Sequence, residues 1–524
     1  MIPVPLRKSR FRTTAAFPAS VHDSTITGMK VTGRQWLILL TVQFTTVLFG
    51  LTATSVTVIL PQLKGALSAT QEQVSWVLTF NLVATAIATP LTGWLAARLG
   101  WRMLMVLSVA GFTASSFLCG LADSLEPLLA LRVVQGAFGA PIFPMGQTII
   151  LTSFHRSQHP FAMTMWGVGG VMGPILGPTF GGLVCDHLSW HWIFFLVVPL
   201  GVIAGSLAFI ALNDDEKGRV RPFDFTGFVF IGIAIAATQL MFDRGQRNDW
   251  FDSPETVAEA VIAGVFFVMF AIHVLTARAP LFEPAVFRDR NFMIGIVVAL
   301  IMGMLQYVPM VLFPPLLQEL QGYPETTIGY LVASRGLGNF ASFLIVTPLT
   351  RFDARFCLFL GLAIQAFAGG MMGSLDMQIT PQAVITSNIL HGLGFGLSYT
   401  PMTVLAFSTM PTRYMTQSNA VFALIRMLGS SVFVSITLVV FAHSAAEANA
   451  NLASSITLFT RDLVAPWVQT FGHLGDTHVQ ARLAAEVNRQ ASMIGYINAF
   501  HLMTLVPILT APLAWLFVLR RSEA

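Results

Sequence analysis

The chain has 524 residues, of which 55% are hydrophobic and only 10% are charged. Soluble domains carry roughly 25% charged residues, so this composition excludes a soluble globular protein and predicts an all-α integral membrane protein. The net charge of +4 gives no indication of a nucleic-acid partner, because the basic residues follow the predicted membrane topology.

The first 34 residues contain no continuous apolar run. They carry several basic residues, among them Arg7, Lys8 and Arg34. A secretory signal peptide needs an apolar core, so we expect residues 1–34 to be a cytoplasmic tail that is not cleaved.

Fourteen apolar segments follow this tail. Each is close to the roughly 20 apolar residues that cross a bilayer as a helix. We expect spans near residues 35–60, 74–96, 103–121, 127–151, 161–184, 191–212, 225–242, 257–275, 292–316, 326–349, 355–374, 382–408, 418–441 and 499–519. With the N-terminus inside, most Lys and Arg lie in inside segments, as the positive-inside rule requires. Both termini are therefore predicted to be cytoplasmic.

An internal repeat organises these spans. The string TPLT at Thr89–Thr92 recurs at Thr347–Thr350, and a Pro-Met pair at 144–145 recurs at 401–402. Two matches at nearly one offset predict two related six-helix halves around a central cavity, as in transporters. The predicted domains are the tail 1–34, an N-terminal bundle 35–212, two inserted helices with their loops 213–290, and a C-terminal bundle 291–524 that includes an outside loop 442–498.

The fifth span combines many glycines with two prolines. Its segment GVGGVMGPILGPTFGG runs from Gly167 to Gly182. Each interior Gly costs a helix about 1 kcal/mol and each Pro about 3 kcal/mol in water, so the pattern indicates a packing or motional role. Glycines at every fourth position let a neighbouring helix approach to backbone contact, and prolines favour a bend. The residues that define this motif are Gly169, Gly173, Pro174, Gly177, Pro178, Gly181 and Gly182.

Three arginines lie inside predicted spans. An arginine at mid-membrane is unfavourable by roughly 2.5 to 3.5 kcal/mol on insertion scales, so Arg132, Arg335 and Arg426 must face protein or water. Gln135 lies one turn after Arg132 on the same helical face, and His391 lies near the repeat-related position in the second half. These residues are candidates for a substrate or proton pathway, and buried structural hydrogen bonds are the alternative.

Several motifs resemble those of a known transporter family. The loop string GWLAARLGWR and the span strings LALRVVQGAFGA and GPILGPTFGG resemble motifs of the major facilitator superfamily. The strings SWHWIFFLVVPLG, MFDRGQRNDWFDS, FRDRNFMIG, PPLLQELQGY and LIRMLGSS are similar to the EmrB branch of its fourteen-span drug:proton antiporters. The resemblance covers about residues 35–520 and implies the major facilitator fold with fourteen transmembrane helices.

In the family, the loop between spans 2 and 3 latches the bundles on the cytoplasmic side. The matching residues here are Gly93, Arg98, Gly100 and Arg102, and simple positive-inside anchoring is the alternative for the arginines. Ala97 stands where the family usually has an acidic residue.

A second departure concerns proton coupling. Antiporters of this type carry a membrane-embedded aspartate in span 1, where this chain has Thr52. A scan of the acidic residues finds none at the middle of a predicted span, and Asp243, at the end of span 7, is the carboxylate to test first.

The resemblance implies an inner-membrane secondary transporter that exports drugs or other amphipathic compounds, by proton antiport and alternating access. It also implies a periplasmic membrane-fusion adaptor and an outer-membrane channel as partners. A dedicated exporter of an anionic metabolite or siderophore, and a transport-dead sensor or scaffold, remain alternatives.

The cysteines Cys119, Cys185 and Cys357 lack C-x-x-C spacing, so we expect no metal site. We also expect no cofactor and no enzymatic activity.

Overall fold

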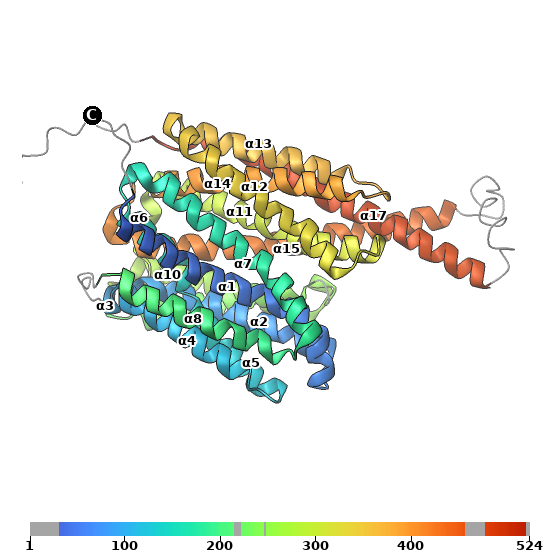
Figure 1. The fold of residues 1–524 in the computed structure, drawn as a ribbon, viewed down its shortest axis with the longest axis horizontal. Helices are drawn as coiled ribbons and strands as arrows, with labels where there is room; N and C mark the ends of the chain where they lie inside the picture. The colour runs from blue at the N-terminus through green and yellow to red at the C-terminus, as the bar shows by residue number, and fades with distance from the viewer. Residues whose placement is uncertain (1–30, 214–221, 246–247, 456–476, 520–524) are drawn as a thin grey trace, which may run out of the picture.

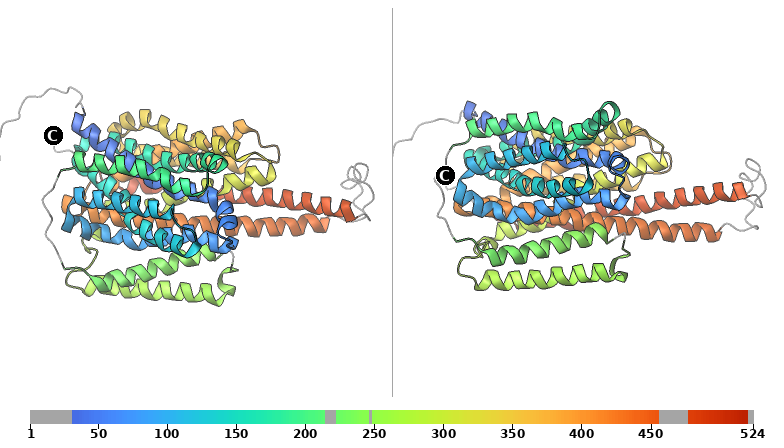
Figure 2. Two further views of the ribbon diagram at one scale, coloured as in Figure 1. Left: turned by 60° about the horizontal axis from the view of Figure 1, so that its bottom comes forward. Right: turned by 90° about the horizontal axis from the view of Figure 1, so that it is seen from below.

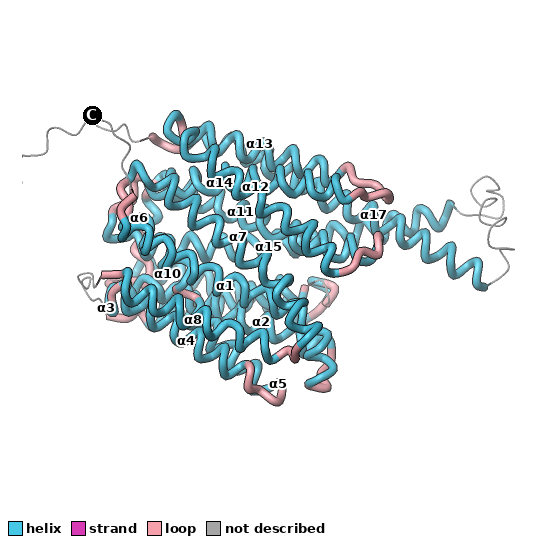
Figure 3. The backbone as a smooth tube through the Cα atoms, in the orientation of Figure 1, coloured by secondary structure: helices cyan, strands magenta, loops and turns pink. Residues whose placement is uncertain are grey.

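The computed structural model describes residues 31–213, 222–245, 248–455 and 477–519. Within these residues the secondary structure is helical and contains no strand (Figures 1 and 3). The predicted all-α class is therefore confirmed. The predicted tail lies almost wholly outside the described residues, as do residues 456–476 of the predicted outside loop.

Helices occur at all fourteen predicted positions. The first group is α1 (Gly33–Ala66), α2 (Gln71–Ala88) continuing through η1 (Thr89–Leu91) into α3 (Thr92–Leu99), α4 (Trp101–Cys119), α5 (Leu125–Gly139) with α6 (Ile142–Ser153), α7 (His159–His187) and α8 (His191–Ala211). Two helices follow, α9 (Phe225–Arg244) and α10 (Pro254–Thr276). The last group is α11 (Arg290–Pro315), α12 (Glu325–Phe352), α13 (Ala354–Gly373), α14 (Pro381–Phe407), α15 (Met415–Ser455) and α17 (Thr477–Thr510).

These helices pack as two bundles with the α9–α10 pair at one side (Figure 2). Helices α1 to α8 contact one another and form what we call the N bundle, and α11 to α17 form the C bundle. The bundles meet where α7 packs on α12 and α14, and where α15 packs on α3 and α6. We call the end at which α1 begins the inner end, and the opposite end the outer end.

Eleven helical segments of the described chain are long and apolar enough to cross a membrane. Helices α7, α12 and α14, at predicted spans 5, 10 and 12, are not among them. In α14 the reason is visible, because polar residues such as Asn388, His391 and Ser398 are buried among neighbouring helices. A helix that faces protein on most sides needs less apolar surface than one that faces lipid. The count of fourteen spans therefore stays a prediction.

Helices α15 and α17 are longer than a membrane span. Helix α15 has 41 residues and α17 has 34, whereas about 20 suffice to cross a bilayer. Their outer parts project together beyond the other helices (Figures 1 and 2). Ring contact between Phe441 and Tyr496, with centroids 4.5 Å apart, joins the pair where it leaves the bundle.

The glycines of α7 lie against α1. A Cβ atom at Gly173 would be 3.0 Å from the Cα of Gly50 and from the carbonyl oxygen of Val47, and one at Gly169 would be 2.6 Å from the Gln43 side chain. The two backbones are thus in direct contact, as a small-residue helix face permits.

The same face continues toward the outer end, where Ser55 donates a 3.0 Å hydrogen bond to the carbonyl oxygen of Gly177. Gly181 is also buried. Pro174, Pro178 and Gly182 lie within the same helix, which is continuous from residue 159 to 187.

This contact yields a prediction with a matched control. Replacing Gly173→Val should force α1 and α7 apart, because the new atoms would meet backbone that has no rotamer to change. Overpacking of this kind costs roughly 1 to 3 kcal/mol, so the melting temperature of the purified protein in detergent should fall. Gly167→Val is the control, because a Cβ atom there meets no heavy atom within 4 Å. Equal melting temperatures for the two variants would contradict the prediction.

Candidate functional site

Arg132 belongs to a hydrogen-bond cluster inside the N bundle. It lies on α5 and is 1% exposed. Its Nε donates to the carbonyl oxygen of Val77 on α2 at 3.0 Å, and its Nη1 donates to Gln135. Gln135 in turn donates to Ser116 of α4 at 2.5 Å. Asn81 of α2 donates to the Arg132 carbonyl oxygen at 2.9 Å. Arg132 and Gln135 therefore tie α2, α4 and α5 together within one bundle.

Arg335 links two helices inside the C bundle, as Arg132 links helices of the N bundle. From α12 it donates to the carbonyl oxygens of Gln306 at 2.7 Å and of Leu305 at 2.8 Å, both on α11. Pro309 has no N–H to donate to the Leu305 carbonyl one turn earlier. The guanidinium group thus satisfies an acceptor that the proline leaves without its helical donor.

Arg426 is satisfied less completely than the other two. It lies on α15, donates from Nη1 to the Gln306 side chain at 3.0 Å, and its guanidinium carbon lies 4.6 Å from the ring centroid of Phe143 on α6. Its Nε is buried without a hydrogen-bond partner in the described structure. Arg426 is also placed between the bundles, since α15 belongs to the C bundle and α6 to the N bundle.

Aromatic rings continue from Arg426 across the bundle junction. The ring centroids of Phe143 and Trp166, on α6 and α7, are 4.5 Å apart. The ring centroids of Trp166 and Tyr399, on α7 and α14, are 6.1 Å apart. The Tyr399 hydroxyl and both amide atoms of Gln147, one turn after Phe143, are buried without partners in the described structure. We call Phe143, Gln147, Trp166, Tyr399 and Arg426 the junction cluster.

Among the described residues, no carboxylate forms an ion pair with Arg132, Arg335 or Arg426. The ion pairs seen between described side chains include Arg244–Glu255, Asp224–His273 and Glu486–Arg489. Buried polar atoms without protein partners are places where water or a ligand binds. The junction cluster therefore offers one positive charge, unpaired polar atoms and aromatic surface in one place.

The bundles are joined at the inner end. Asn419 of α15 donates to Thr148 of α6 at 2.9 Å, and the hydroxyls of Thr164 on α7 and Thr400 on α14 are 3.1 Å apart. These contacts lie within a few turns of the inner end of each helix. The structure is consequently an inner-closed conformation.

The residues of the loop motif lie at this inner contact. A Cβ atom at Gly93 would be 3.2 Å from the Cα of Gln417 on α15, so α3 and α15 touch through backbone. Gly100 connects α3 to α4 with a φ of +81°, which favours glycine. Arg98 lies over the Trp94 ring and Arg102 over the Phe209 ring, at 5.3 and 4.2 Å.

The remaining candidates lie apart from the junction cluster. Thr52 is buried on α1 and its hydroxyl donates to the Leu48 carbonyl oxygen of its own helix at 2.8 Å. Asp243 is exposed at the outer end of α9 and accepts a 2.5 Å hydrogen bond from Thr79. His391 is fully buried on α14, and neither ring nitrogen has a partner in the described structure.

Sequence reasoning missed four members of the junction cluster. Phe143, Trp166 and Tyr399 are aromatic residues in apolar spans, where nothing in the sequence separates them from lipid-facing residues. Gln147 carried a usable signal, because an amide within an apolar span needs a partner inside the protein.

Comparisons with known proteins agree with this architecture. The sequence profile described as Major Facilitator Superfamily matches residues 42–434. The multidrug export protein EmrB of Haemophilus influenzae is 31% identical over 481 residues, which cover 89% of this chain and 92% of that protein. The fatty acid resistance protein FarB of Neisseria gonorrhoeae is 29% identical, with coverage of 89% and 92%. A crystal structure of the human organic anion transporter MFSD10 (TETRAN) superposes with a TM-score of 0.57 at 13% identity, covering 92% of this chain and all of that one.

Two helical bundles that meet at a polar and aromatic junction define a membrane transporter of the major facilitator class. The chain belongs to the major facilitator superfamily and resembles its EmrB-type members.

The different hydrogen bonding of the arginines generates a prediction. Arg132→Gln should lower the melting temperature strongly, because Val77 and Gln135 lose their donors and each buried acceptor left without a partner costs about 1 to 3 kcal/mol. Arg426→Gln should lower it less, because only one hydrogen bond is lost. The measurement is thermal unfolding of both variants in the same detergent. A larger loss for Arg426→Gln would contradict the assignment of Arg132 as the structural arginine.

Proposed function

We propose that this protein is an efflux transporter that exports drugs or other amphipathic compounds by alternating access between its two bundles. The junction cluster carries the proposal, because both bundles contribute to it and a rocking motion would expose it to either side in turn. The similarity to EmrB, whose name describes multidrug export, supports the direction of transport. The inner contacts Asn419–Thr148 and Thr164–Thr400 would then be the gate that opens toward the cytoplasm.

We further propose proton antiport as the driving force. One proton that enters down about 100 mV and one pH unit releases about 2.3 kcal/mol from the potential and about 1.4 kcal/mol from the pH gradient. The Thr52 hydroxyl cannot exchange a proton near neutral pH. His391 is the better candidate, because an imidazole can take up and release a proton and both ring nitrogens of His391 are buried without partners in the described structure.

The proposed location is the bacterial inner membrane with both termini cytoplasmic, as the distribution of basic residues predicts. The projecting α15–α17 hairpin then lies in the periplasm. Its outer part is exposed and polar, with a hydrogen bond between the side chains of Asn449 and Asn488. We propose it as the docking element for a membrane-fusion adaptor that leads to an outer-membrane channel.

A second candidate function is export of amphipathic anions. Arg426, without a carboxylate partner in the described structure and stacked on Phe143, would hold a negative group, and the cluster's aromatic rings would hold an apolar body. The name of FarB refers to fatty acids, which have this chemistry. A transport-dead scaffold remains the alternative from a different class.

Efflux from proteoliposomes tests the proposed function. Vesicles loaded with a hydrophobic cation, a neutral drug or an organic anion are given an acidic outside, and the inside pH is recorded. We expect efflux of at least one class that accelerates with the gradient and is accompanied by proton entry. Efflux that ignores the gradient would exclude proton antiport, and no efflux of any compound would favour the scaffold.

The junction cluster gives a more specific prediction in the same assay. Arg426→Gln should reduce anion efflux by roughly tenfold or more, since hydrogen bonds to charged groups contribute about 1.5 to 3 kcal/mol, and should leave efflux of neutral compounds nearly unchanged. Arg426→Lys, which keeps the charge, is the matched control and should retain part of the anion efflux. An equal loss for anions and neutral compounds would show that Arg426 acts on the fold.

A further inference from the structure

The inserted helix α9 lies against both bundles. It contacts α2 of the N bundle and α15 of the C bundle. An apolar cluster joins the three helices, with Ala86 from α2, Ile231 and Ile235 from α9, and Leu424 from α15. The α9–α10 pair is therefore more than a peripheral addition, because one of its helices bridges the parts that have to move.

Polar contacts attach the outer half of α9 to both neighbours. On the α15 side, the side chains of Gln239 and Ser431 exchange hydrogen bonds of 2.8 and 3.0 Å, and Ser435 donates to the carbonyl oxygen of Phe242 at 2.6 Å. On the α2 side, Thr79 donates to Asp243 at 2.5 Å.

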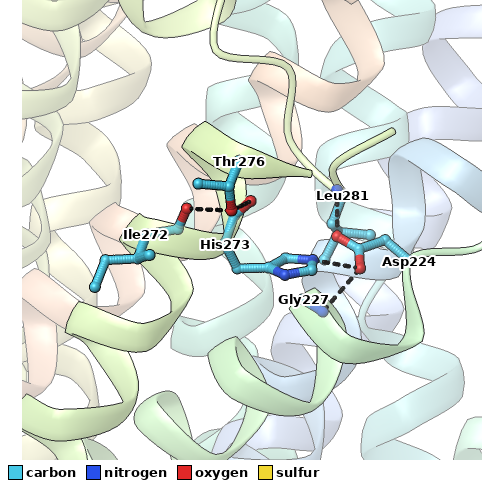
Figure 4. Close-up of polar contacts among 6 residues, drawn as sticks. All are labelled: Asp224, Gly227, Ile272, His273, Thr276 and Leu281. Carbon is cyan, nitrogen blue, oxygen red and sulfur yellow. Dashed lines mark hydrogen bonds and ion pairs between the residues drawn. The ribbon is translucent and has the colours of Figure 1, made fainter. Parts of the chain in front are cut away.

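The inner end of the pair is held together by one carboxylate. Asp224 accepts hydrogen bonds from the Gly227 backbone N–H at the start of α9, from His273 of α10, and from the Leu281 backbone N–H, at 2.9, 2.8 and 2.9 Å (Figure 4). The Asp224 side chain is 7% exposed. Helices α9 and α10 and the segment at 281 thus form one unit.

This unit is attached to the C bundle at its inner end as well. Gln417 of α15 donates to the Leu281 carbonyl oxygen at 2.6 Å. The segment continues through the buried Phe282 and Val286 to Asp289, which caps the first helix of the C bundle by accepting from Phe292. On the N-bundle side, the contacts include the Phe223 and Trp94 rings, whose centroids are 4.9 Å apart, and Ile87 of α2, which lies beside Gly232 of α9.

A rigid helix cannot keep both sets of contacts while the bundles rock against each other. Interior packing allows discrete rearrangements rather than gradual deformation, so one side of α9 must slip. The α15 side has three side-chain hydrogen bonds and a short buried connection. The α2 side has one hydrogen bond near the exposed outer end, the Arg244 guanidinium 6.0 Å from the centroid of the Trp76 ring, and otherwise apolar packing such as Ile87 beside Gly232.

We propose that the α9–α10 unit moves with the C bundle and that the Thr79–Asp243 contact is made in the inner-closed conformation and broken in the inner-open one. Closure of the outer end would bring α2 toward α15 and displace α9 from its place against α2. Asp243, a candidate proton carrier on sequence grounds, then has a conformational role, because it holds α9 to α2 in the inner-closed conformation. The inference rests on the proposed alternating-access transport.

Two reversible cross-links test this proposal in the full chain, with Cys119, Cys185 and Cys357 replaced by Ser. One variant carries T79C and D243C, and the other carries Q239C and S431C, each bridged by a short bifunctional thiosulfonate. We expect the first bridge to stop efflux until it is reduced, and the second to leave at least half of it. Equal effects of the two bridges, or the reverse order, would overturn the proposal.

A spectroscopic measurement separates failure of this proposal from failure of the transport function. Nitroxide labels at K64C and E319C, both exposed near the outer ends of different bundles, report the outer distance by double electron–electron resonance. The T79C–D243C bridge should hold this distance at its long value, and the Q239C–S431C bridge should leave both long and short distances populated. The proposal fails if the first bridge permits the short distance, whether or not the protein transports any tested compound.

The variants Thr79→Val and Asp243→Asn add a test without cross-links. Each removes or weakens one hydrogen bond and leaves Gln239 and Ser431 intact. We expect the ratio of long to short outer distances to fall by roughly tenfold, the effect of losing a hydrogen bond to a charged group. Ser108→Ala, a buried change within the N bundle, is the control. An unchanged ratio in both variants would overturn the assignment of this contact to one conformation.

Discussion

A guanidinium group buried among apolar helices must find acceptors within the protein, and the way each arginine does so divides this molecule into fixed and movable parts. Arg132 and Arg335 are satisfied by groups of their own bundle, including the Leu305 carbonyl that Pro309 leaves without a donor. They stabilise each bundle as a unit. Arg426 is satisfied in part, and its remaining contact crosses to Phe143 of the other bundle. The least satisfied arginine therefore lies at the place where the two rigid units meet.

Rigid bundles and a movable junction require different packing. Within the N bundle, α1 and α7 touch through backbone at Gly50 and Gly173, so no side chain can rearrange between them. Between the bundles, the inner contacts combine single side-chain hydrogen bonds, such as Asn419–Thr148, with one close backbone approach of α3 to α15 at Gly93. A hydrogen bond of this kind contributes only about 0.5 to 1.5 kcal/mol net, which suits contacts that form and break. In its hydrogen bonds the α9–α10 unit follows the same division, because α9 has three side-chain hydrogen bonds with α15 and one with α2.

The sequence predicted the helices well because each is an apolar run bounded by loops or caps. Thr32 and Thr70 begin α1 and α2 with capping boxes, which the apolar pattern alone would locate only approximately. The sequence could not separate Arg426 from Arg132 and Arg335, because all three are arginines in apolar spans. Their difference depends on Gln306 and Phe143, which are distant in the chain. The position of α9 against α15 could not be predicted from the sequence either, because Gln239 and Ser431, which hydrogen-bond to each other, are 192 residues apart in the chain.

Two features make the interior of the protein more positive. Thr52 replaces the aspartate that is usual in span 1, and Arg426 has no carboxylate partner among the described residues. The Thr52 hydroxyl donates a hydrogen bond to the Leu48 carbonyl oxygen of its own helix. Unlike an aspartate, it brings no negative charge to the interior. If the junction cluster binds substrate as proposed, the charge of Arg426 would destabilise a cationic substrate there and stabilise an anionic one. An anion leaving the cell also moves down the membrane potential, which supplies about 2.3 kcal/mol per charge at 100 mV. For an anionic substrate, a transporter without an embedded carboxylate would therefore lack one proton carrier but would keep part of its driving force.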